Sequence, residues 1–142
     1  MQIDLVHPQI QQNTGSIART CAALKAPLHI IGETGFEISE KNVRRAGLDY
    51  WPYVELHQHE SWEYFEASSD YENIWLFSKF GERIYTNVSY STNDLLVFGS
   101  ETAGLGEEFL SQYKPEQILK IPILCDGVRS LNLSNAVSIA AY

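Results

Sequence analysis

Three clusters of polar residues follow apolar runs or precede helical patterns, and their residue types could hold a ligand. They are residues 13–19 (Asn-Thr-Gly-Ser-Ile-Ala-Arg), residues 98–105 (Phe-Gly-Ser-Glu-Thr-Ala-Gly-Leu), and residues 121–122 (Ile-Pro) followed by 130–135 (Ser-Leu-Asn-Leu-Ser-Asn). Ligands of open α/β sheets bind beyond the carboxyl ends of the strands. Each cluster alone also fits a helix cap or a turn. The three clusters together predict a ligand site.

Several common types of site have no support in the sequence. It contains no phosphate-binding GxxxxGK[ST] motif, and Gly99, Gly104 and Gly106 do not form the GxGxxG of a dinucleotide site. His57 and His59 have a spacing that a metal could use, but no third ligand stands near them, so solvated or internally bonded histidines are expected. No serine lies in a nucleophile elbow. We therefore expect neither a bound metal nor covalent catalysis.

Short apolar runs alternate with helical patterns along the chain, which predicts an α/β fold with a mostly parallel sheet and flanking helices. The expected strands cover residues 2–7, 28–31, 53–57, 74–77, 95–98 and 118–123. The expected helices cover residues 15–25, 39–46, 61–67, 106–113 and 133 onward. Residues 13–15 are expected to form the turn and cap before the first helix. The clusters at 98–105 and 121–122 lie where strands end.

Composition limits the class of protein and its partners. The 142 residues make one ordinary domain, with 44% hydrophobic and 20% charged residues, close to globular averages. Ten Lys and Arg against eighteen Asp and Glu give a formal net charge of −8, so a nucleic-acid partner would have to be held locally. There is no membrane-spanning run or secretory signal, and Cys21 and Cys125 suggest neither a disulfide framework nor a zinc site. We expect a cytoplasmic protein.

The sequence resembles the SPOUT, or α/β-knot, methyltransferases. Within them it is similar to the small single-domain tRNA 2′-O-methyltransferases that modify the ribose of the wobble nucleotide. The most specific block is residues 129–137 (Arg-Ser-Leu-Asn-Leu-Ser-Asn-Ala-Val). The resemblance runs nearly end to end, and its other parts are residues 7–8, 13–22, 28–31, 35–36, 44–50, 97–102 and 120–122.

This resemblance implies a fold and a cofactor. The C-terminal segment would thread through a loop as a deep trefoil knot, a rare exception to the rule against threading. S-adenosylmethionine would bind in the knot, held mainly by backbone groups of Phe77, Gly99, Ile121, Ser130 and Leu131. Glycine at position 99, which has no Cβ, would let the chain approach the cofactor closely. The reaction would need no metal.

The resemblance also assigns side chains to methyl transfer onto a ribose 2′-hydroxyl. A guanidinium has a pKa above ~12 and is a poor general base, so we expect Arg19 to organise the target phosphate and stabilise the developing alkoxide. The phosphate or water would take the proton. Asn13 would fix the local loop and the nucleotide, and Glu101 would accept hydrogen bonds from backbone or from Arg19. Ser130 and Asn132 would orient the ribose hydroxyl and the knot.

The implied partners are a tRNA and a second copy of the chain. In the homodimer, basic residues of one subunit, such as Arg44 and Arg45, would meet the cofactor site of the other. The residues expected to bind RNA are Arg19, Arg44 and Arg45. The single domain 1–142 is expected to lack the end of its last helix, which the family continues beyond Tyr142. Two alternatives stay open: a ribosomal-RNA 2′-O-methyltransferase of the same fold, and a catalytically silent dimeric RNA-binding protein. The joint presence of Arg19, Glu101, Ser130 and Asn132 favours the enzyme.

Overall fold

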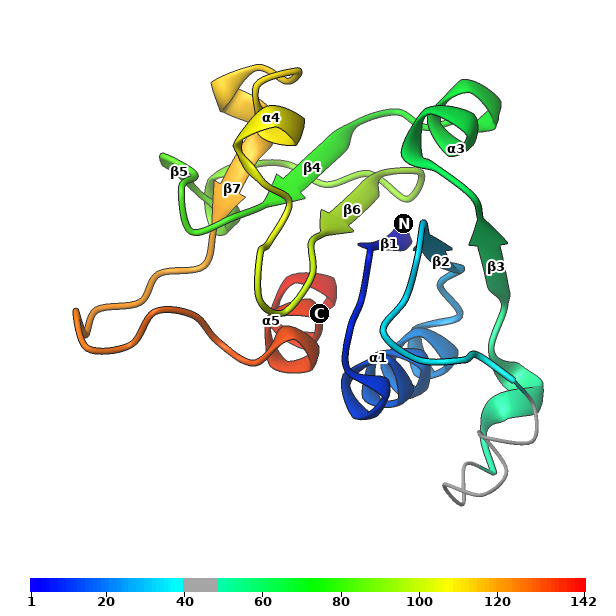
Figure 1. Ribbon diagram of the computed structural model, residues 1–142. Coiled ribbons are helices and arrows are strands. Elements are labelled where there is room, and N and C mark those ends of the chain that lie inside the picture. Colours follow the sequence, from blue (N-terminus) through cyan, green and yellow to red (C-terminus); the bar gives the residue numbers. More distant parts are fainter. Residues whose placement is uncertain (40–48) are drawn as a thin grey trace.

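Seven strands form one sheet in the computed structural model, which describes residues 1–39 and 49–142 (Figure 1). Their order is β3-β2-β1-β6-β4-β7-β5, and every pair of neighbours is parallel. The expected parallel sheet is therefore confirmed. The strands are β1 (Gln2–Val6), β2 (Leu28–Ile31), β3 (Leu56–His59), β4 (Ile74–Phe77), β5 (Arg83–Ile84), β6 (Leu95–Phe98) and β7 (Ile118–Lys120).

Helices cover both faces of the sheet. Helices α1 (Gln11–Leu24) and α5 (Leu133–Ala141) lie on one face, and α3 (Trp62–Ser68) and α4 (Glu107–Leu110) lie on the other (Figure 1). Three short 3-10 helices complete the described elements: η1 (Trp51–Tyr53), η2 (Tyr85–Asn87) and η3 (Pro115–Gln117). The central strands are thus buried on both faces, which explains their nearly continuous apolar sequences.

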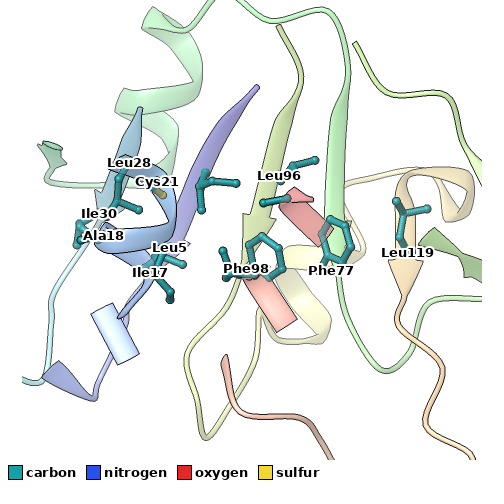
Figure 2. Close-up of a cluster of buried hydrophobic side chains, with 13 residues drawn as sticks. Leu5, Ile17, Ala18, Cys21, Leu28, Ile30, Phe77, Leu96, Phe98 and Leu119 are labelled. Carbon is teal, nitrogen blue, oxygen red and sulfur yellow. The ribbon is translucent and has the colours of Figure 1, made fainter. Parts of the chain in front are cut away.

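Successive residues of a strand point to opposite faces, and this divides the core in two. Figure 2 shows the core beneath α1, where Leu5, Leu96 and Phe98 of the strands meet Ile17, Ala18 and Cys21 of the helix. On the other face, Val6, Leu76 and Val97 pack with Trp62 and Phe65 of α3. Each fully buried aliphatic or aromatic side chain contributes about 1.5–3 kcal/mol. This packing holds the strands in place relative to one another, so their carboxyl ends lie at one edge of the sheet.

Several expected boundaries are wrong. Helix α1 begins at Gln11, so Asn13, Thr14 and Gly15 lie within the helix and not in a cap before it. The strand expected at 53–57 is β3 at Leu56–His59, after the 3-10 helix η1. Helix α4 and strand β7 are shorter than expected, and the two-residue strand β5 was not predicted. The helix expected over 39–46 falls almost wholly outside the described residues.

A polar cluster that is buried at Asp4 and His29 lies on the face beneath α3. The Nδ1 atom of His29 is 2.9 Å from Nε2 of His59, and the His29 ring stacks on His57 with centroids 4.9 Å apart. Burial and the two neighbouring histidines lower the pKa of His29 to about 4. Asp4, its neighbour across the strand pair, is fully buried, and burial raises its pKa well above the usual value. In the part of the chain that is described, no group of three or more His, Cys, Asp or Glu residues could hold a metal ion.

The low pKa of His29 makes stability depend on pH. In the unfolded chain His29 takes up a proton near its ordinary pKa of 6.5, but in the folded chain it does so only near 4, so stability falls as pH drops through this window. The slope approaches about 1.4 kcal/mol per pH unit, the value for one proton. The variant His29→Asn keeps a polar atom near the Nδ1 position and removes the titration, so its stability should lose this slope.

Urea unfolding of parent and variant between about pH 7 and about pH 4 measures the effect. The difference between the two proteins isolates His29, because Asp4, with its raised pKa, contributes the opposite slope in both. Equal pH dependence in the two proteins would show that His29 does not resist protonation in the fold.

Candidate functional site

A pocket of about 730 Å³ lies at the edge of the sheet where β4, β6 and β7 end. Because all strands are parallel, the segments that follow them gather at the same edge. The pocket lies within the size range of small-molecule sites. Its lining consists of residues 77–80 after β4, 98–106 after β6, Ile121 and Ile123 after β7, the segment 129–132, Ile10 and Asn13 near the start of α1, and Leu133 and Ala136 of α5.

The pocket brings together most of the residues that the sequence pointed to. All five predicted cofactor contacts line it: Phe77, Gly99, Ile121, Ser130 and Leu131. Asn13, Glu101 and Asn132 line it as well. Three predicted residues are placed elsewhere or not described. Arg19 lies on α1 outside the described lining, and Arg44 and Arg45 fall outside the described residues.

Lys79, Phe80 and Arg129 are among the lining residues that were not predicted as site residues. The first two follow the expected strand 74–77 directly, so their position at a strand end was the signal available in the sequence. Arg129 begins the block 129–137 that carries the most specific part of the resemblance.

A chain of hydrogen bonds joins three walls of the pocket. The half-buried carboxylate of Glu101 accepts from Asn13 Nδ2 at 3.1 Å, and also from the backbone N–H groups of Gln9 at 2.7 Å and Ile10 at 3.1 Å. Asn13 Oδ1 accepts from Asn132 Nδ2 at 2.9 Å. We call this the Glu101–Asn13–Asn132 chain. It ties the loop after β6 to the start of α1 and the start of α5.

The two end residues of the Glu101–Asn13–Asn132 chain also accept hydrogen bonds from backbone N–H groups at the starts of helices. Asn132 is the N-cap of α5, where its Oδ1 accepts from the N–H groups of Ser134 at 2.9 Å and Asn135 at 3.3 Å. Such a cap contributes about 0.5–2 kcal/mol. The N-cap residue of α1 is Ile10, whose side chain cannot accept a hydrogen bond, and Glu101 supplies acceptors there from the distant β6 loop. This tertiary partner explains why the helix begins before the polar residues that looked like its cap.

Arg19 is held by Tyr50. Its guanidinium carbon lies 4.7 Å from the centroid of the Tyr50 ring, a cation–π contact. The Tyr50 hydroxyl donates to the carbonyl of Gly15 at 2.7 Å, which fixes the ring against α1. Burial raises the pKa of Tyr50, so the ring stays neutral near pH 7. The hydrogen bonds that Glu101 accepts in the described residues come from backbone N–H groups and from Asn13. Arg19 instead packs on the aromatic ring of Tyr50.

The structure gives a physical reason for glycine at position 99 in addition to the expected one. A Cβ added to Gly99 would lie 2.0 Å from the carbonyl carbon of Gly104 and 2.2 Å from the nitrogen of Leu105. Those backbone atoms belong to the tight turn in which Ser100 and Gly104 exchange hydrogen bonds of 3.2 and 2.9 Å. The missing Cβ thus makes room for the turn. The expectation that it also lets the chain approach the cofactor closely stays a prediction.

The walls of the pocket combine apolar surface with free peptide groups. The rings of Phe77 and Phe98 stack with centroids 4.6 Å apart, and Leu105, Ile121 and Leu131 add aliphatic surface. Residues 121–132 carry no helix or strand, only a turn at 126–127, so their peptide groups are not engaged in a helix or a sheet ladder. Flat apolar walls with N–H and C=O groups suit a ligand that pairs an aromatic ring with polar edges.

Comparison with known proteins gives consistent results over the whole chain. The model of the SpoU rRNA Methylase family matches residues 1–142. The tRNA (cytidine(34)-2'-O)-methyltransferase of Saccharophagus degradans is 41% identical over 140 residues, which cover 99% of this chain and 90% of that protein. In the residues that the structure describes, no helix is long and apolar enough to cross a membrane.

Solved structures agree with the sequence matches. One, described as giving structural insights into the 2-OH methylation of C/U34 on tRNA, has a TM-score of 0.90 and 43% identity, and covers 99% of this chain and 91% of its own. The AdoMet-bound rRNA methyltransferase of Sinorhizobium meliloti is more distant, with a TM-score of 0.79, 24% identity, and coverage of 98% and 53%. The first structure confirms the expected α/β-knot fold class, and the second shares the fold.

The tight fit of Gly99 leads to a stability prediction. Gly99→Ala forces a Cβ into backbone of the turn, and overpacking of this kind costs about 1–3 kcal/mol. Gly127→Ala is the matched control, because a Cβ there meets only Cys125 Sγ at an ordinary 3.7 Å. Urea unfolding should show a loss of that size for Gly99→Ala and a change within about 0.5 kcal/mol for the control. Equal stability of the two variants would mean that the turn yields without cost.

Proposed function

The chain belongs to the SpoU rRNA methylase family, and from this we propose that it transfers a methyl group from S-adenosylmethionine to the ribose 2′-hydroxyl of nucleotide 34 in tRNA. One observation carries the proposal. A pocket with aromatic walls and free peptide groups lies at the strand ends of a chain that matches a tRNA (cytidine(34)-2'-O)-methyltransferase over 99% of its length. The ribosomal-RNA alternative rests on relatives that match at lower identity.

The residues of the pocket fit S-adenosylmethionine. Backbone groups of Gly99, Ile121, Ser130 and Leu131 would hold its polar edges, and the apolar side of the pocket at Phe77 would face its ring. When bound, the cofactor supplies a methyl group on a positively charged sulfur. A distant member of the same fold was solved with AdoMet bound, which supports this assignment.

The side chains of this protein then have two tasks, positioning and charge stabilisation. Transfer to a hydroxyl depends on holding the ribose oxygen in line, which can lower a barrier by several kcal/mol, of order 7 or more in well-oriented systems. Ser130 and Asn132 lie on the pocket wall where they can orient the ribose. Arg19 cannot act as a base, so its guanidinium binds the target phosphate and stabilises the developing alkoxide. The proton passes to the phosphate or to water.

This assignment of Arg19 requires a second copy of the chain. Arg19 is exposed on α1 and packs on Tyr50, outside the described lining of the pocket. Helix α5 packs beside α1 and leaves Ile139 exposed, with Tyr142 following it. A homodimer formed through this surface would bring Arg19 to the pocket of the partner, and the role of Arg44 and Arg45 as RNA contacts stays a prediction, because both fall outside the described residues. In solution the particle mass would be twice the 16.1 kDa of the chain.

Cellular location follows from the substrate. A protein that modifies tRNA works where tRNA is present, and both cysteines are free, Cys21 buried and Cys125 exposed. Free thiols fit a reducing compartment. We place the protein in the cytoplasm.

Methylation of total tRNA tests the function. The protein is incubated with labelled S-adenosylmethionine and total tRNA, and the tRNA is digested and sequenced by mass spectrometry. The expected product is a 2′-O-methyl group on nucleotide 34. Label that enters only ribosomal RNA in a parallel reaction would favour the alternative enzyme, and RNA binding without transfer would favour the silent RNA-binding protein.

Substitution of Arg19 tests its role in the same assay. Arg19→Ala should lower the single-turnover rate by ~10²-fold, the effect of removing one preorganised donor at a developing oxyanion. Arg19→Lys should keep part of the rate, because an ammonium supplies charge but not the bidentate fork. The control is Arg83→Ala, which removes an exposed arginine that donates to the Asn87 carbonyl away from the pocket. A near-parental rate for Arg19→Ala would remove this residue from the site.

A further inference from the structure

An aromatic ring stands at the rim of the pocket. Phe80 lines the pocket and yet is 73% exposed, so its ring has a solvent-facing surface next to the ligand site. Single exposed aromatic residues are common on protein surfaces. Phe80 differs from the other exposed aromatic side chains because of what holds it and what surrounds it.

The backbone holds Phe80 in a fixed place. The Phe80 N–H donates to Ser78 Oγ at 3.2 Å, and the Gly81 N–H donates to the Ser78 carbonyl at 3.1 Å. The Ser78 N–H in turn donates to the carbonyl oxygen of Leu119 in β7 at 2.9 Å. Gly81 packs so closely on β7 that an added Cβ would lie 2.7 Å from the Leu119 carbonyl carbon. The turn 78–81 is therefore anchored to the sheet, and it holds the backbone of Phe80 at the rim of the pocket.

A cation lies over this ring, in a protein that is strongly acidic. The Lys79 ammonium lies over the Phe80 ring, 5.1 Å from its centroid, and Arg129 also lines the pocket. The chain as a whole has a net charge of −8, whereas the pocket lining holds two cations, Lys79 and Arg129, and one carboxylate, Glu101. An aromatic face beside cations is the combination that binds single-stranded nucleic acid, because the ring stacks on a base and the cations meet phosphates.

We propose that Phe80 and Lys79 form a platform for the substrate RNA, in which Phe80 stacks on an unpaired base at the target nucleotide and Lys79 binds an adjoining phosphate. This inference rests on the proposed function and names the subsite that receives the RNA. Unpaired loop bases are the parts of RNA that proteins recognise by stacking on aromatic side chains. One face of the Phe80 ring carries the Lys79 ammonium, and the base takes the other. Stacking tolerates any base, so the platform sets affinity and position and leaves base choice to other contacts.

Binding of an anticodon stem-loop RNA tests the platform without depending on catalysis. Fluorescence anisotropy gives the dissociation constant of the RNA for the parent, Phe80→Ala, Phe80→Tyr and Lys79→Ala, each with and without the demethylated cofactor. Phe80→Ala should weaken binding by at least ~5-fold, the lower end of the effect of losing one stacked base, and Phe80→Tyr should restore it. Tyr64→Ala is the matched control, because Tyr64 is also 73% exposed but lies on α3, away from the pocket.

Salt dependence separates the two residues. Lys79→Ala should reduce the slope of log K against log salt by ~1, the effect of losing one phosphate contact, and Phe80→Ala should leave that slope unchanged. The affinity of Phe80→Ala for S-adenosylmethionine, measured by calorimetry, should equal that of the parent.

Three results would overturn the inference. RNA affinity that is unchanged in Phe80→Ala, or equally weakened by Tyr64→Ala, would show that the ring makes no specific contact. A loss of cofactor affinity in Phe80→Ala would assign the ring to the cofactor instead. If the parent methylates tRNA and Phe80→Ala binds RNA normally, only this inference fails. If the parent neither binds nor methylates tRNA, the proposed function fails with it.

Discussion

The site depends on the carboxylate of Glu101, which holds together segments that are far apart in the sequence. It accepts a hydrogen bond from Asn13, 88 positions away, and Asn13 accepts one from Asn132, 119 positions away. Hydrogen bonds to a charged group contribute roughly 1.5–3 kcal/mol each, about twice those between neutral groups. The loop after β6, the start of α1 and the cap of α5 are therefore fixed relative to one another. The pocket lies in the space between them.

The sequence predicted the sheet better than the site because burial on both faces leaves a direct mark on composition. The runs at 28–31, 74–77 and 95–98 are almost wholly apolar, and each is a strand at those residues. The pocket residues that follow the strands could be identified from the same runs. The start of α1 could not, because its partner Glu101 is distant in the sequence. The glycines at 99 and 104 mark a turn, but their close approach to each other depends on the three-dimensional shape of that turn.

Side-chain roles were harder to predict than positions. The sequence names Arg19 as a functional residue but gives no indication that it packs on Tyr50 away from the pocket of its own chain. Phe80 and Lys79 show the reverse case. Nothing in their residue types points to a function, and only their position at the rim of the pocket suggests one. Both cases reflect the same physical point. A residue acts through its surroundings, and these are set by contacts between distant segments.

A double-mutant cycle on the Glu101–Asn13–Asn132 chain tests the central claim most directly. Asn132→Ser keeps an oxygen that can cap α5, removes the amide that donates to Asn13 and adds no charge, and Glu101→Gln removes the charge while keeping one acceptor oxygen. The two side chains share Asn13 and do not bond each other directly, so coupling between them must pass through it. Urea unfolding of the four proteins should give a coupling free energy of at least about 0.5 kcal/mol, as in other hydrogen-bond networks. Additive effects within about 0.3 kcal/mol would show that the β6 loop and α5 are held independently, and would contradict the account.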